Sequence, residues 1–228
     1  KVGALHVRTP TLQVDIRDLV IDWRPAALAR GGLDMNTLAA AEVSVASTPS
    51  DEAATLPASL EVPAALRIDA FRIDRLLIGK LVDGQPAPPD LEFTALAGAL
   101  ASDGRQHRLT GLSLGAPFGQ LGADLELDGR RPFPLKAAAR LATRQVDQAW
   151  AVQASASGDL EHLKLDATAS GAGMDGTAAI MATPFAPLPL KSAVLKLVGL
   201  DPSRFSAAAP RAALDIDATL EPSVAPGA

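Results

Sequence analysis

The residues best suited to chemistry in this sequence are its three histidines, because imidazole serves both as a general base and as a metal ligand. They are His6, His107 and His162. None has a His, Cys, Asp or Glu partner at a ligand spacing such as His-x-x-x-His. Glu161 adjoins His162, but neighbouring residues of a strand point to opposite faces. We therefore interpret all three as surface histidines and expect no metal site.

Motifs of nucleophilic catalysis and nucleotide binding do not occur: there is no Gly-x-Ser-x-Gly, P-loop or Gly-x-Gly-x-x-Gly. "GAGMDG" (171–176) is better interpreted as a loop between strands. The Asp residues are many, as in "VDIRD" and "LDID", but they lie between apolar residues, where the solvated face of a sheet carries its charges. We expect neither an enzyme nor a bound cofactor.

The composition limits both the core and the partners. A hydrophobic content of 48% is ample for a core, but aromatic residues make up only 4% and Tyr is missing, so Leu, Val, Ile and Ala must supply a thin core. A net charge of −5 without basic runs disfavours nucleic acid as a partner. The absence of Cys excludes disulfides and thiolate metal sites.

The elements that must position any site are β-strands. In "FRIDRLLIG" (71–79), Phe71 and Ile73 alternate with charged residues, and the alternation then restarts on the other parity at Leu76. "VDIRDLVID" (14–22) repeats this pattern. Only half of the positions that a helical template selects from Phe71 are apolar, whereas a period of two fits every apolar residue once the change of parity is allowed. An extra residue in a bulge or corner would keep one face apolar, so we predict that the sheet bends there.

The same alternation recurs at 121–129, 133–141 and 213–220, and turn signals such as "SDGR" punctuate the chain, which predicts roughly a dozen strands. Pro25 followed by "AALARGG" predicts one short helix near residues 25–31, and "DPSRF" (201–205) begins another. Two patterns also recur along the chain: the alternation that begins at Val14 begins again at Phe71, and "PFPLKAAARL" (132–141) resembles "PLPLKSAVLKL" (187–197). They favour repeats of about 55 residues, although two copies of each leave chance as an alternative.

We therefore expect an all-β fold: a long, curved, antiparallel sheet in the form of an open half-pipe with an apolar interior, occupying residues 1–228 as one elongated segment. A filled sandwich with Ala-rich layers would produce the same pattern. The opening "KVGALHV" has no initiator Met, and we interpret the chain as a piece of a longer protein. The residues expected to line the interior are Leu12, Val14, Ile16, Leu19, Ile21, Leu66, Ile68, Phe71, Ile73, Leu76, Ile78, Leu112, Leu114, Leu125, Leu127, Leu163, Leu165, Leu214 and Ile216.

Three stretches resemble the TamB family of AsmA-like proteins. "LQVDIRDLVIDWRPAALARGGLDMNTLAAAEVSV" (12–45) is similar to the family's Trp-x-Pro-x-x-Leu-x-x-Gly signature between strands. "HRLTGLSLGAPFGQLGADLELDGRRPFPLKAAARL" (107–141) resembles its pairing of a Pro-Phe/Trp-Gly turn with a strand closing on Asp-Gly-x-x-Pro-Phe-Pro-Leu. "GLDPSRFSAAAPRAALDID" (199–217) is similar to a third recurring stretch.

This resemblance implies a β-taco fold in the periplasm of a Gram-negative bacterium, in a protein anchored in the inner membrane. It implies that the apolar groove conducts phospholipids towards the outer membrane, and that a TamA-like outer-membrane protein is the partner through regions outside this chain. A rival hypothesis is a scaffold or chaperone that assembles outer-membrane β-barrels or autotransporters by β-augmentation at its strand edges, without conducting lipid.

Overall fold

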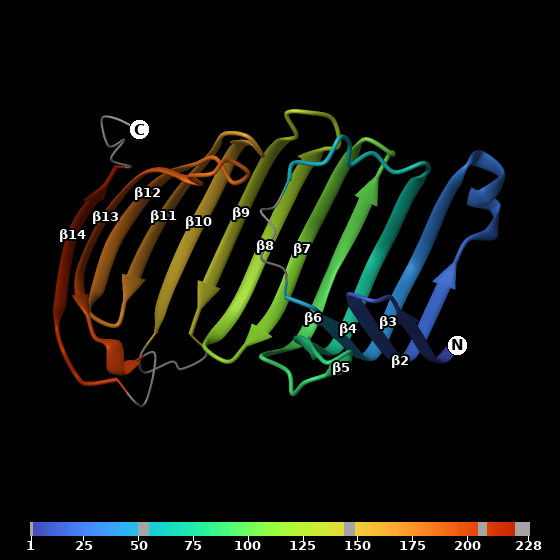
Figure 1. Cartoon of the computed structure of the whole chain (residues 1–228), viewed down its shortest axis with the longest axis horizontal. Coiled ribbons are helices and arrows are strands. Elements are labelled where there is room, and N and C mark those ends of the chain that lie inside the picture. Colours follow the sequence, from blue (N-terminus) through green and yellow to red (C-terminus); the bar gives the residue numbers. More distant parts are fainter. Residues whose placement is uncertain (1, 50–54, 144–148, 205–208, 222–228) are drawn as a thin grey trace. The chain divides into compact units, whose positions relative to one another are not determined.

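The structure is a computed structural model, and it describes residues 2–49, 55–143, 149–204 and 209–221. Its strands form one open, mixed sheet of 14 strands, in the order β1-β2-β3-β4-β6-β7-β8-β9-β10-β11-β12-β13-β14, with β5 beside β4 (Figure 1). The expected all-β fold with an open, curved sheet is confirmed. The chain divides into two compact units: unit 1 comprises residues 1–52 and 61–124, and unit 2 comprises residues 53–60 and 125–228.

Unit 1 contains the longest strands. They are β1 (Val2–Arg8), β2 (Leu12–Trp23), β3 (Gly32–Ser47), β4 (Ala65–Val82), β5 (Gln85–Pro86), β6 (Leu91–Ser102) and β7 (Gln106–Ala116), with the first part of β8 (Gly119–Asp128). The expected short helix is present as the 3-10 helix η1 (Pro25–Arg30), which Gly31 ends at a φ of 74°. A left-handed residue at the end of a helix is the conformation that glycine adopts most easily.

One strand pair corrects the expectation of a purely antiparallel sheet. β3 and β4 run parallel, with Leu38 beside Phe71 and Val43 beside Leu76. The physical reason is the connection between them, residues 48–64, because a link of more than a dozen residues can carry the chain back to the same end of the sheet. Alternation within each strand does not specify the direction of its neighbour, so the sequence pattern alone does not predict this parallel pair.

A change of side-chain parity crosses four strands of unit 1 at the same level, and we call this line the crease. Ile16 pairs with Val43, Val43 with Leu76 and Leu76 with Phe93. Five residues further along each strand, Ile21, Leu38, Phe71 and Gly98 form a second row of paired residues. Positions five apart point to opposite faces in a regular strand, so both rows share one face only where a strand changes phase between them.

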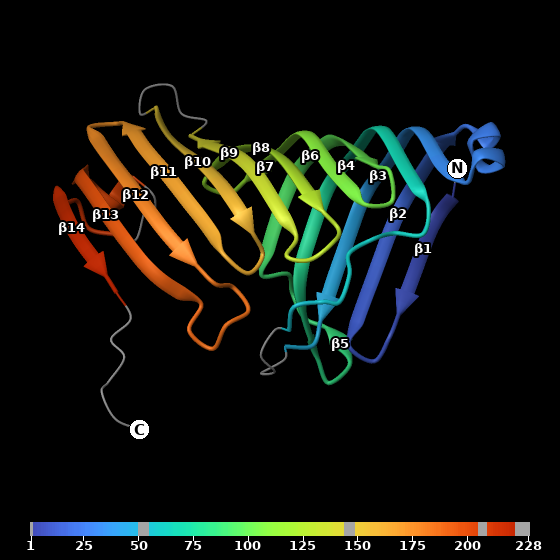
Figure 2. The ribbon, with the colours of Figure 1, turned by 90° about the horizontal axis from the view of Figure 1, so that it is seen from above.

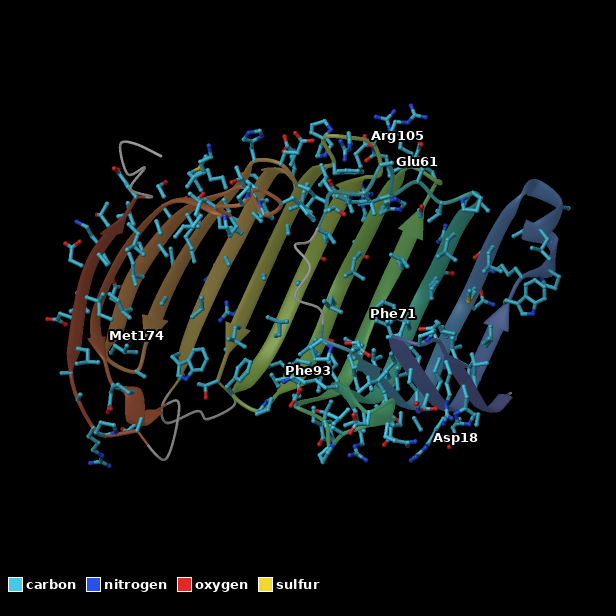
Figure 3. The ribbon with its side chains drawn as sticks, in the orientation of Figure 1. Asp18, Glu61, Phe71, Phe93, Arg105 and Met174 are labelled. Carbon is cyan, nitrogen blue, oxygen red and sulfur yellow. The ribbon has the colours of Figure 1, made fainter. Side chains whose placement is uncertain are left out.

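The backbone at the crease explains how both rows keep one face. Asp18 of β2 and Ala95 of β6 have φ angles of 52° and 51°. Such angles are uncommon for residues other than glycine and mark a local bend. Figure 3 shows Asp18 at the margin of unit 1 where the long strands turn, with Phe71 away from that margin. The predicted bend at 14–22 therefore coincides with a positive φ at the crease, whereas the bend at 71–79 remains a prediction.

Unit 2 is a series of shorter antiparallel strands (Figure 2). Its strands are the last part of β8, β9 (Pro134–Ala142), β10 (Trp150–Asp159), β11 (Leu163–Gly171), β12 (Met174–Ala182), β13 (Leu190–Leu200) and β14 (Leu214–Leu220). The short helix expected at 201–205 is present as η3 (Pro202–Arg204), and residues 205–208 of that region lie outside the described chain.

The most buried side chain of unit 2 lies beside β9. Phe133 is 0% exposed and is the one large side chain of the described residues with less than 2% of its surface exposed. The turn before it is tied to residues 56–60, since Arg131 donates hydrogen bonds to the carbonyl oxygens of Leu56 and Pro57, and the backbone N–H of Leu60 donates to Gly129. This end of the unit is the part most like a conventional core.

The pairing of strands in unit 2 brings together two parts of the predicted repeat of about 55 residues. Leu135 and Leu190 lie in the same row of unit 2, joined through Gly158, Leu163 and Ala182. They are the Leu residues of the two recurring "PLK" patterns. β2 and β4, which carry the other recurring pattern, both pair with β3, one antiparallel and one parallel, and so run in opposite directions. A repeat of about 55 residues, and a single elongated segment, remain predictions.

Candidate functional site: one apolar face in each unit

The apolar face of unit 1 is defined by rows of paired residues, because directly paired residues of neighbouring strands point to the same side. One row runs from Leu5 through Ile16, Val43 and Leu76 to Phe93. The neighbouring row contains Val14, Val45, Ile78 and Leu91. Pairing in these and adjacent apolar rows includes the predicted residues Val14, Ile16, Ile21, Phe71, Ile73, Leu76 and Ile78. Leu12 pairs with Ser47, Leu19 pairs with Val2, and Leu66 and Ile68 lie beyond an irregularity in the β4–β6 register, so their place on this face remains a prediction.

Leu112 and Leu114 of β7 lie on the same face. Their neighbour Ser113 pairs with Ala97, which lies between Leu96 and Gly98 and so points to the other side. At Gly98 the face is crowded, since an added Cβ would lie 2.8 Å from the ring of Phe71. Phe71 therefore covers the space that the glycine leaves in its row.

The apolar face of unit 2 has a different composition. Its central row is almost entirely alanine, and two flanking rows mix alanine with Leu, Ile and Val. The central row consists of Ala139, Ala154, Ala167, Ala178, Leu195 and Ala218. The predicted residues Leu163, Leu165 and Ile216 lie on this face, beside Ala182, Ile180 and Leu197. Small side chains leave room above the strands at the centre of the face.

Three other predicted residues are placed less completely. Leu125 and Leu127 of β8 are half-buried while Asp124 and Glu126 are exposed, which agrees with the predicted alternation, but their face is not fixed by a pairing register. Leu214 pairs with Leu200 beyond an irregularity in the register and is 41% exposed. The place of these three residues on an apolar face therefore remains a prediction.

Most of these side chains are only half-buried. The described strands all belong to the one sheet, so none of them forms a second layer over these faces. Of the predicted residues only Leu19, Ile68 and Leu114 are buried, whereas Ile21 and Ile78 are 41% and 36% exposed. Within each described unit this is an open apolar surface and not the filled sandwich that the sequence also allowed. Figure 3 shows Met174 of β12, which is among the buried residues of unit 2.

The opposite face is polar and carries the charges. In unit 1, Glu42 contacts Arg17 and Arg75 at 3.0 and 3.1 Å, and Arg75 also contacts Glu92 at 3.1 Å. These four residues form an ion-pair ladder along the crease. In unit 2, a row of paired polar residues contains Arg140, Gln153, Thr168, Thr177, Lys196 and Asp217.

Several Asp residues have structural partners. Asp103 accepts hydrogen bonds from the backbone N–H groups of Gln106 and Arg105, and these bonds lower the pKa of its carboxyl group. Asp124 and Asp215 each accept a hydrogen bond from a glycine with positive φ in the neighbouring strand, Gly111 and Gly199. Both glycines lie in strands whose registers shift nearby, so these carboxylates stabilise irregular strand geometry.

The histidines lie apart. His6 and His162 are exposed, His107 is half-buried, and their nearest polar partners are Asp15, Asp159 and Ser102. The sequence did not reveal the pairing of His6 with Asp15, which lie opposite each other on β1 and β2. A hydrogen bond from His6, followed by one from Gln13, lowers the pKa of Asp15. In the described part of the chain, no group of three or more His, Asp or Glu residues could hold a metal ion.

Sequence reasoning missed the alanines of unit 2 and a pocket of about 710 Å³ at the ends of its strands. The pocket lies between the segment around Leu56, the turn at Arg131, the turn at His162 and the β12–β13 connection. These segments are far apart in the sequence, so no local signal reveals their meeting. Across the described residues, no helix combines the length and apolar character that crossing a bilayer requires.

Comparison with known proteins identifies no relative: no family model, no curated protein and no solved structure matches this chain.

Proposed function

We propose that this chain is a stretch of a periplasmic phospholipid conduit, in which acyl chains lie on the apolar faces of the two units and head groups stay in water. The observation that carries the proposal is the half-buried state of the aliphatic side chains on one face of the sheet in each unit. Exposed apolar patches on this scale mark sites where another apolar surface binds. The polar opposite face, with its ion pairs, is suited to water.

The dimensions fit an acyl chain. Six strands of unit 2 contribute to the alanine row, and at ~4.8 Å between neighbouring strands the row spans about 24 Å. One leaflet of a bilayer has a hydrocarbon depth of about 15 Å, half of the ~30 Å core. Each CH₂ group that leaves water for such a surface gains up to ~0.8 kcal/mol. Transfer by this route needs no reaction and no catalytic residue.

The resemblance to the TamB family supports the wider setting: an inner-membrane anchor, transport towards the outer membrane and a TamA-like partner. The rival function is a scaffold that pairs its outer strands with an unfolded barrel protein. β1 and β14 each pair with a single neighbouring strand, so both functions have a surface available. The half-exposed apolar face favours lipid, because β-augmentation uses backbone groups and needs no such face.

A matched pair of substitutions tests the conduit. Ala139 is half-buried on the apolar face of β9, and Ala138 is exposed on the polar face beside Ser155. Ala139→Asp places an unpaired carboxylate on the acyl surface, where its desolvation opposes binding, whereas Ala138→Asp places it in water. Native mass spectrometry of the purified chain should detect bound phospholipid in the wild type and Ala138→Asp, and much less in Ala139→Asp.

Circular dichroism of both variants controls for folding, since a lost fold would also remove lipid. Equal amounts of bound lipid in two folded variants would refute the conduit, as would a wild-type chain that binds no phospholipid when mixed with it.

A further inference from the structure

The pocket of unit 2 combines fixed positive charge with apolar walls. Its volume is about 710 Å³, and four separate segments contribute to it. Its lining includes two cationic side chains and four apolar ones: Arg131 and Lys191, and Leu56, Phe185, Leu188 and Leu190. All of them belong to unit 2.

The guanidinium group of Arg131 is held in place by the backbone. Nε donates to the carbonyl oxygen of Pro57 at 3.1 Å, and Nη2 donates to that of Leu56 at 2.9 Å. Within the described residues Nη1 has no hydrogen-bond partner. A planar guanidinium that is already oriented loses little side-chain entropy when it binds an oxyanion.

Lys191 supplies a second cation, and it makes no ion pair with any described residue. Glu161 and His162 also line the pocket, and His162 lies 3.7 Å from Asp159. The two cations, Arg131 and Lys191, against the single carboxylate of Glu161 leave the lining with a net positive charge. This charge favours an anion, and Glu161 can meet a positive group carried on the same molecule.

The apolar walls connect this pocket to the apolar face. Leu188 is 62% exposed and Leu190 is 38% exposed. Leu190 pairs with Ala182, in the same row as Leu163 and Leu135, so it belongs both to the pocket and to the apolar face of unit 2. A molecule whose charged end lies between Arg131 and Lys191 can therefore place an alkyl chain on the apolar face.

We propose that this pocket binds the phosphate of a phospholipid head group, with the acyl chains running onto the apolar face of unit 2 from Leu190. The inference rests on the proposed conduit and adds to it a fixed binding site for the head group. Charge complementarity and the continuity through Leu190 select a phospholipid over a free anion, which would not use Phe185 and Leu188. An uncharged lipid would not use the cations.

The test uses titration calorimetry of the whole chain with three ligands: dihexanoyl phosphatidylglycerol below its micelle concentration, dihexanoylglycerol and inorganic phosphate. The phospholipid should bind at least ~10-fold more tightly than the other two, since a charge-assisted contact in a partly desolvated pocket contributes about that factor. Lys191→Gln should remove most of this advantage. Arg131→Gln should do the same, but it also releases Leu56 and Pro57, so Lys191→Gln decides if Arg131→Gln fails to fold.

Lys136→Gln is the matched control, because Lys136 is exposed on the polar face of β9 opposite Ser157 and outside the pocket. Equal effects of Lys191→Gln and Lys136→Gln would overturn the inference, as would equal affinities for the charged and uncharged lipids. Inorganic phosphate binding as tightly as the phospholipid would instead indicate a free-anion site and overturn the lipid assignment. Failure of the conduit itself has a different signature: native mass spectrometry would detect equal amounts of phospholipid on Ala138→Asp and Ala139→Asp, while the affinities for the short-chain lipids would stay as expected for the pocket.

Discussion

Phe133→Ala should be more destabilising than truncation of any other phenylalanine ring among the described residues. Phe133 is 0% exposed, and the open sheet buries few other large side chains. Truncation of a fully buried ring costs ~3–5 kcal/mol, which is a large share of the ~5–15 kcal/mol that stabilises an ordinary domain. Phe133 has a φ of 64°, but alanine bears the same backbone strain, so the loss measures packing alone.

Urea denaturation followed by tryptophan fluorescence measures this loss. Trp150 is 6% exposed in unit 2, and Trp23→Phe removes the other fluorophore, which is 41% exposed in unit 1. Phe118→Ala is the control, because Phe118 is 52% exposed and its truncation should cost about 0.5 kcal/mol or less. A loss below ~1 kcal/mol for Phe133→Ala, or equal losses for the two variants, would refute the assignment of Phe133 as the packing centre.

Three further predictions concern charge and face. Ile216→Asp should lower the amount of bound lipid, measured by mass spectrometry, while Asp217→Asn on the polar face leaves it unchanged; equal amounts in the two variants would contradict the face assignment. Asp217 is a better control than Asp215, because Asp215 accepts a hydrogen bond from the backbone N–H of Gly199. Glu42→Gln should lower the free energy of unfolding by ~1 kcal/mol in low salt, because the Glu42 side chain is only 15% exposed and lies between two arginines. The loss should be smaller in 1 M salt, which screens the ion pairs. A loss that does not depend on salt would contradict the ion-pair ladder. The pKa of the Asp103 carboxyl group, measured by NMR titration, should lie below 3.8. The stability that this group contributes is therefore present above its unfolded pKa and is lost as the pH falls through its lowered, folded pKa. A titration midpoint at or above 3.8 would contradict this prediction.

Strict alternation made the strands and their apolar face predictable. In unit 2, Leu163 and Leu165 alternate with Lys164 and pair across β12 as a half-buried sheet requires. The change of parity in 14–22 coincides with the positive φ of Asp18, whereas no backbone angle or register shift of β4 marks the change in 71–79, so that bend remains a prediction. What the pattern could not predict is that the parity changes of β2, β3, β4 and β6 lie at one level, because this depends on register between strands and not on the sequence of any one of them.

The remaining features arise from contacts between distant segments. Alanine is a weak hydrophobic signal, so Ala139 and Ala154 were not recognised as the centre of a face until their pairing placed them in one row. The direction of β4 depends on how the connection from β3 crosses the sheet, which turn signals do not specify. The pocket brings Leu56 together with Arg131 and Lys191, and only the folded chain joins them.

The most direct test of the conduit is photo-crosslinking inside the cell in which the full-length protein works. A photoreactive amino acid is placed at Ile73 and Ala139 on the apolar faces, and at Arg72 and Ala138 on the polar faces, one position at a time. If acyl chains pass over these faces, Ile73 and Ala139 should yield phospholipid adducts while Arg72 and Ala138 yield few. Equal lipid labelling of both faces, or protein adducts without lipid at Ile73 and Ala139, would contradict the conduit, and adducts of an unfolded barrel protein along β1 or β14 would favour the scaffold in its place.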